Sequence, residues 1–201
     1  MTIAEFGATI WGRDWVRLAE PMQISKPNPR LPKARSLARN GHVEIGPLAA
    51  GTIRCAVTAG STTETVSISI PSYLPDEIRA VTALQASADA IEAKGGDLPD
   101  TLHAQLAEGE LSAVPSTADC QCTCRSRAQP CVHKLATFYV LSQRIDEKPS
   151  LALELRGIAT VRELPSRTAL CTERWAALTK IDMAYYFSTS SVERSCNSAT
   201  D

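Results

Sequence analysis

Residues 120–145, CQCTCRSRAQPCVHKLATFYVLSQRI, decide how this chain folds, because they hold two close pairs of metal-type ligands ahead of an apolar stretch. The first pair is Cys122 and Cys124; after a gap of six residues come Cys131 and His133. In an extended strand, side chains two residues apart point to the same face, so the first two thiols can reach one ion together. A proline fixes the turn before the second pair. The spacing therefore predicts that four ligand atoms converge.

Three thiolates and one imidazole form the ligand set of a closed structural zinc site, in which four protein ligands leave no position for water. The sequence thus predicts Zn²⁺ with a structural role. Cys120 could replace Cys122 as a ligand, although the six-residue gap favours Cys122. A disulfide cluster or a set of buried free thiols would also account for these cysteines. Disulfides need an oxidising compartment, and the start, MTIAEFGATIWGRDW, lacks the basic and long apolar regions of an export signal.

The motif CQCTCRSRAQPCVH resembles the SWIM zinc finger, whose pattern is Cys-x-Cys, a variable gap and Cys-x-His. The stretches FGATIWGRDWVRLAE, RSLARNGHV (35–43), 95–124 and PSLALELRG (149–157) look like parts of bacterial SWIM-domain proteins, so the resemblance covers residues 6–157. The family often has Pro-Asp where this chain has Arg125-Ser126, and Lys in place of Val132. These positions are not ligands, so the departures concern the partner specificity of the loop. The resemblance implies binding of DNA or proteins, beside a Snf-type DNA-dependent ATPase.

Composition and charge restrict the class of protein. The 201 residues are 44% hydrophobic, which suffices for one substantial core or two small ones. Apolar runs fall far short of the roughly 20 residues that cross a bilayer, so we expect a soluble cytoplasmic protein with no membrane segment. The net charge is −1, but residues 1–60 carry eight Lys or Arg and four Asp or Glu, whereas residues 61–118 carry two and nine. This asymmetry either forms a binding face or lets one part dock on another.

The hydrophobic pattern predicts an α+β fold: a small antiparallel sheet with packed helices, plus a finger made of a short β-hairpin and a helix. The expected helices are 6–18, 75–94, 99–108, 132–145 and 166–187, the strands are 41–45, 52–58 and 65–70, and the hairpin is 119–124. His103 is expected to be exposed. The corresponding segments are 1–74 (N-terminal helix, basic Pro-rich arm and meander), 75–118 (helical), 119–158 (zinc finger) and 159–201 (C-terminal helix and disordered tail).

Basic residues gather in two places. Four prolines among the basic residues of 20–39 predict an extended arm, which either contacts phosphates or is a surface loop meeting the acidic middle of the chain. The basic residues around the finger either stabilise the negative charge of the metal cluster or contact phosphates. The candidate nucleic-acid contacts are Lys26, Arg30, Lys33, Arg35, Arg39, Arg125, Arg127 and Lys134.

The sequence has no recognisable catalytic constellation. The histidine near the cysteines, His133, would be occupied by zinc, and no Gly-rich phosphate loop is present. We therefore expect a zinc-stabilised, non-catalytic binding module of nucleic-acid machinery. The alternative is a protein-interaction adaptor in which zinc is purely structural and no nucleic acid is bound. Replacing Cys131 or His133 is expected to release the metal and unfold the finger locally.

Overall fold

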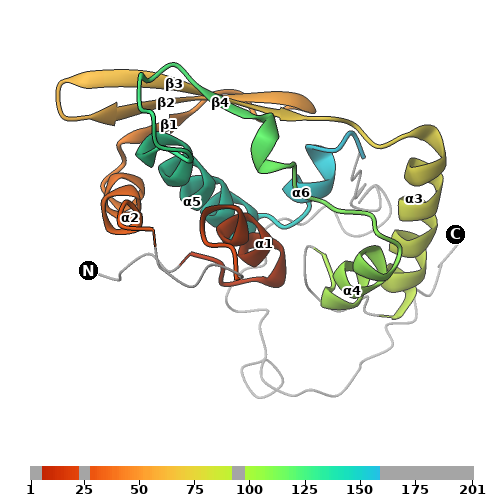
Figure 1. Ribbon diagram of the computed structural model, residues 1–201. Helices are drawn as coiled ribbons and strands as arrows, with labels where there is room; N and C mark the ends of the chain where they lie inside the picture. Colours follow the sequence, from red (N-terminus) through yellow and green to blue (C-terminus); the bar gives the residue numbers. More distant parts are fainter. Residues whose placement is uncertain (1–5, 23–27, 92–97, 159–201) are drawn as a thin grey trace, which may run out of the picture. The chain divides into compact units, whose positions relative to one another are not determined.

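The computed structural model describes residues 6–22, 28–91 and 98–158, all of which belong to one compact unit, residues 1–160. The predicted helix 166–187 and tail 188–201 lie outside the described residues. In chain order the elements are α1 (Ile10–Ala19), α2 (Leu31–Arg39), β1 (Val43–Ile45), β2 (Gly51–Ala59), β3 (Thr62–Ile70), α3 (Pro75–Ile91), α4 (Asp100–Glu108), the 3-10 turn η1 (Thr117–Asp119), β4 (Cys120–Cys122), α5 (Val132–Glu147) and α6 (Leu151–Glu154) (Figure 1). The predicted α+β class is confirmed. Among the described helices, none has the length and apolar character needed to span a membrane.

The four strands form one antiparallel sheet in the order β1-β2-β3-β4. The predicted alternation in β3 is present, because Val66, Ile68 and Ile70 are buried while Ser69 is exposed. The prediction of a hairpin at 119–124 is wrong, because the strand of the finger, β4, pairs with β3 rather than with a second strand of its own. The metal-ligand segment is therefore joined to the main sheet.

Helix α5 is the centre of the fold. It packs against α1 and α2 on one side and against all four strands on the other, as Figure 1 shows below the sheet. Its side chains are accordingly buried on more than one face, including Leu135, Phe138, Leu141 and Ile145. Buried residues from Trp11 to Ile158 form one hydrophobic cluster. The helix that follows the cysteines is thus also the main core helix.

The far end of α5 holds the start of α1 through Asp146. Its carboxylate accepts hydrogen bonds from the backbone N–H of Gly7, the backbone N–H of Thr9 and the Thr9 hydroxyl, each at 2.8 Å. Thr9 in turn caps α1 by accepting from the N–H of Gly12 at 3.0 Å. A Cβ at Gly12 would lie only 2.1 Å from Asp146 Oδ1, so this close approach requires glycine.

The expectation of an extended basic arm is wrong for residues 31–39, which form α2. Pro32 lies in the first turn, where a backbone N–H has no acceptor within the helix. The N–H that proline lacks is therefore not needed, and proline does not prevent helix formation there. The buried side chains Leu31, Ala34 and Leu37 recur at helical spacing and face the core. Residues 23–27, which include Lys26, lie outside the described part.

A polar network joins the three core helices. Arg35 of α2 donates from Nε to the hydroxyl of Tyr139 of α5 at 3.1 Å, and both side chains donate to Oε1 of Glu20 after α1. Burial raises the pKa of Tyr139, and the hydrogen bond with Glu20 raises it further, so the hydroxyl keeps its proton. Arg35 is therefore engaged within the fold.

Helix α4 attaches to α1 through His103, which was expected to be exposed and is instead half-buried. Its Nε2 lies 2.7 Å from Asp14 Oδ2, and its ring meets Trp11 edge-on, with 5.1 Å between the ring centroids. The sequence did not predict this contact, because the two residues are 89 positions apart.

Candidate metal centre

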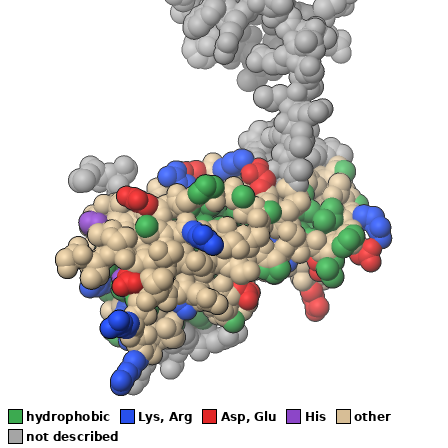
Figure 2. Space-filling model, turned by 90° about the horizontal axis from the view of Figure 1, so that it is seen from above, with side chains coloured by type: hydrophobic (Ala, Val, Ile, Leu, Met, Phe, Trp, Pro, Cys, Tyr) green, Lys and Arg blue, Asp and Glu red, His purple; other side chains and the backbone are tan. Residues whose placement is uncertain are grey.

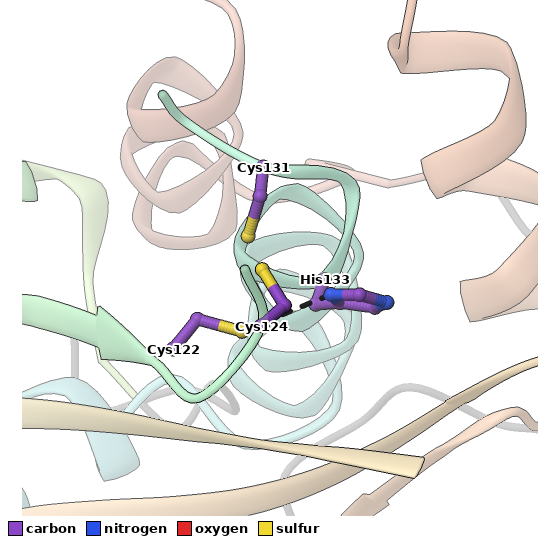
Figure 3. A group of neighbouring side chains, drawn as sticks. All are labelled: Cys122, Cys124, Cys131 and His133. Atoms are coloured by element: carbon purple, nitrogen blue, oxygen red, sulfur yellow. Dashed lines mark hydrogen bonds between the residues drawn. The ribbon is translucent and has the colours of Figure 1, made fainter. Parts of the chain in front are cut away.

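Four side chains from β4, the following bend and the start of α5 converge on one point. Each of Cys122, Cys124, Cys131 and His133 offers a ligand atom, and all four atoms lie within 4.8 Å of one another. Figure 3 shows the three sulfur atoms directed toward one another, with the His133 ring beside them. The predicted grouping is therefore present in the structure, at the junction of the sheet and the core helix.

The first pair is positioned by β3. Cys122 is the last residue of β4 and lies opposite Val66. Thr123 then donates its N–H to the carbonyl of Thr65 at 3.0 Å, and its hydroxyl accepts from the N–H of Thr65 at 3.0 Å and donates to Glu64. Sequence reasoning placed both thiols on one extended strand; instead the strand ends at Cys122 and a bend turns Cys124 toward the helix.

Backbone N–H groups point at the first two sulfurs. Burial raises the pKa of Cys122 to about 12, although a hydrogen bond from the backbone of Cys124 opposes this rise. Burial also acts against ionisation of Cys124, but the backbone N–H of Ser126 and the thiols of Cys122 and Cys131 outweigh it and lower the pKa of Cys124. Donors of this kind stabilise thiolates, which are the form that binds zinc.

The second pair comes from the N-terminus of α5, where Cys131 is the N-cap and His133 lies in the first turn. The positive end of the helix dipole favours the negative charge that three thiolates bring. Burial lowers the pKa of His133; Lys33 adds to this effect and Glu64 opposes it, so the neutral ring that binds metals is favoured.

The donor set fits a tetrahedral zinc ion. His133 Nδ1 lies 3.7 Å from Cys122 Sγ. With Zn–S of about 2.3 Å and Zn–N of about 2.0–2.1 Å, the sulfur–nitrogen edge of a tetrahedron is about 3.6 Å. Three thiols and one imidazole are also the soft ligands that zinc prefers. The residues present therefore suit Zn²⁺ in both chemistry and spacing.

Cys120, the candidate substitute ligand, is not part of this group. It is buried opposite Ile68, and burial raises its pKa to about 11 while the nearby Lys134 opposes that rise. The charge of Lys134 thus acts on Cys120.

The other predicted basic contacts are dispersed. Arg125 and Arg127 are exposed, and no hydrogen bond or ion pair joins them to another residue of the described chain. On the face seen in Figure 2, Lys and Arg are spread among Asp and Glu instead of forming one continuous patch. The remaining candidates are Lys33, which is exposed, Arg30, which is half-buried, Arg35, which pairs with Glu20, and Arg39, whose guanidinium lies 5.6 Å from the Phe6 ring centroid.

Sequence reasoning missed the residues that support the ligands, namely Glu64, Thr65, Thr123 and Ser126. The only local signal was the hydroxyl residue inside Cys-Thr-Cys, since a threonine there can bond to a neighbouring strand. That β3 is the neighbouring strand could not be predicted, because its residues lie 58 positions away.

Comparison with known proteins agrees with this geometry. Residues 105–142, which run from α4 into α5, match the family model of the SWIM zinc finger. The chain contains a SWIM zinc finger. The resemblance seen in the sequence is thereby confirmed, and the SWIM finger together with the grouped donors supports zinc as the cofactor.

The similarity extends beyond the SWIM finger. A protein of Mycobacterium tuberculosis, described as uncharacterized, is 31% identical over 156 residues, which are 74% of this chain and 55% of the relative. The chain thus spans little more than half the length of that relative. No solved structure matches the chain significantly.

Proposed function

We propose that this chain is a zinc-stabilised, non-catalytic binding module in which Cys122, Cys124, Cys131 and His133 hold one Zn²⁺. The observation that carries this proposal is the convergence of the four ligand atoms within 4.8 Å. Four protein ligands complete a tetrahedral shell, so no position is left for water or substrate. The ion would join the bend after β4 to the first turn of α5.

We further propose that the module works in nucleic-acid-linked machinery in the cytoplasm, with loop 125–130 facing phosphates. Arg125 and Arg127 are exposed on this loop and have no partner in the described part of the chain. Lys33 is exposed and close enough to His133 to affect its titration. Cationic side chains supply most of the affinity for nucleic-acid backbones. The five free cysteines of the described residues fit a reducing compartment.

The test is salt-dependent binding of the zinc-loaded chain to a nonspecific DNA duplex, followed by fluorescence anisotropy. The double variant Arg125→Gln with Arg127→Gln should lower the slope of log affinity against log salt by about 2, since each phosphate contact contributes about 0.9. The matched control is Arg144→Gln with Lys148→Gln, because both residues are exposed basic groups at the other end of α5.

Zinc content is measured on the same samples. If the zinc-loaded chain binds no DNA at about 50 mM salt, the nucleic-acid half of the proposal is rejected while the zinc module stands. If the control pair lowers the slope as much as Arg125→Gln with Arg127→Gln, the loop is not the contact surface.

The second candidate function is a protein adaptor. Three observations favour it: the mixed charge of the face in Figure 2, the net charge of −1 and a pocket beside the finger. The resemblance to bacterial SWIM proteins suggests a Snf-type DNA-dependent ATPase as the partner. Affinity purification from native cells with and without nuclease separates the two functions. Partners that persist after nuclease treatment support the adaptor, and partners that disappear support nucleic acid.

A further inference from the structure

We propose that a pocket beside the finger binds an apolar side chain of a partner protein together with an adjacent carboxylate. The inference rests on the adaptor half of the proposed function and specifies its partner. The pocket has a volume of about 440 Å³, which lies within the range of about 300–1,000 Å³ of ligand sites. It lies among the end of α1, the turn η1, the loop that carries the metal ligands and the first two turns of α5.

The walls of this pocket are mainly apolar. Leu18 and Ala19 of α1, Pro130 of the loop and Phe138 of α5 line it. Ala19 and Phe138 are buried in the core, whereas Pro130 is half-buried. An apolar side chain inserted here would be removed from water. This removal is the source of affinity in the central pockets of protein interfaces.

One cation lies in this apolar setting. Lys134 lines the pocket, is half-buried, and has no hydrogen bond or ion pair with any residue of the described chain. Lys134 lines the pocket together with the buried Cys120. Since no carboxylate of the described chain pairs with Lys134, a ligand carboxylate next to the apolar group could pair with it.

The exposed residues next to the pocket indicate that its ligand is a protein rather than a small organic acid. Met22, which follows the lining residue Pro21, is 81% exposed. A large flexible apolar side chain in that position suits a broad contact around a central anchor. The exposed lining residues Thr117 and Gln129 supply a polar border on other sides.

The pocket is also connected to the metal centre. Gln129 and Pro130 belong to the loop between Cys124 and Cys131, and Lys134 directly follows His133. An ion held by those ligands would fix one wall of the pocket and the lysine opposite the partner carboxylate. This arrangement gives the structural zinc a role in recognition.

The test uses the zinc-loaded full chain and an array of short peptides with a central Leu, Phe or Trp flanked by Glu, Gln or Lys. We expect the Glu-flanked apolar peptides to bind about tenfold more tightly than the Gln-flanked ones, as for a charged hydrogen bond. Lys134→Met should remove the preference for Glu over Gln. Thr117→Trp, which fills the pocket from its rim, should weaken all of these peptides. Lys148→Met, at the other end of α5, is the matched control and should bind like the wild type.

Equal binding of Glu-flanked and Lys-flanked peptides, or an unchanged preference in Lys134→Met, would overturn the proposal. Tighter binding of free 3-phenylpropionate than of any peptide would identify a small-molecule site and reject the protein partner. Arg125→Gln with Arg127→Gln should bind the peptides normally. Zinc content and DNA binding are measured on each variant, so loss of peptide binding alone leaves the proposed function intact, whereas absence of zinc from the wild-type chain rejects that function.

Discussion

Cys120 and Cys122 lie two residues apart on β4, but only Cys122 belongs to the group of ligand atoms. Cys122 lies at the end of the strand beside His133, whereas Cys120 lies opposite Ile68 and lines the neighbouring pocket. Cys122→Ala should therefore lose zinc, and Cys120→Ala should keep one ion per chain. Elemental analysis of the purified proteins checks both. Zinc loss in Cys120→Ala but not in Cys122→Ala would reverse the ligand assignment.

Gly12 is the second residue with a sharply defined role, because any side chain there would collide with Asp146. Gly12→Ala should displace the carboxylate from Gly7 and Thr9, and so destabilise the fold by about 2–4 kcal/mol through overpacking and the lost cap. Thermal unfolding measures the change. Gly109→Ala is the control, since its nearest contact would be an ordinary 3.5 Å. Equal melting temperatures for the two variants would show that the close approach is unimportant.

At the scale of elements, the link between β3 and β4 determines how well the first ligand pair is held. Thr123→Val removes the hydroxyl that bonds to Thr65 and Glu64 while keeping the shape of the side chain. Loss of a group that supports metal ligands typically costs about 10-fold or more in affinity. Competition with a chromophoric chelator should show this loss. Thr52→Val, an exposed change on β2, should leave zinc affinity unaltered.

The elements differ in how far the sequence predicts them. The ligand spacing and the alternation in β3 are local patterns, so the group of metal ligands, the meander and α5 follow from the sequence. Helix α2 was not predicted, because the prolines and basic residues around Leu31, Ala34 and Leu37 were interpreted as an extended arm. The pairing of β4 with β3 and the contact of His103 with Asp14 join residues far apart in the chain, which no local pattern encodes.

At the scale of the whole molecule, the metal-bearing helix is the same helix that carries the core. The sequence predicted that metal loss would unfold the finger locally. Since α5 packs against α1, α2 and every strand, we expect a wider effect. Removing zinc with a chelator should lower the melting temperature of the whole fold and speed amide hydrogen exchange in α1. Unchanged exchange in α1 with faster exchange only in residues 120–133 would instead support local unfolding.

Helix α5 is fixed near both ends, by the ligand His133 in its first turn and by Asp146, which holds Gly7 and Thr9, near its last. The two residues are thirteen positions apart, which corresponds to about 20 Å along the helix. Because both contacts lie on one helix, we expect metal binding and the packing of residues 7–9 to be coupled, and such a coupling free energy is equal in both directions. A change that detaches residues 7–9 from α5 should weaken zinc binding, and loss of the ion should make those residues more accessible to a protease.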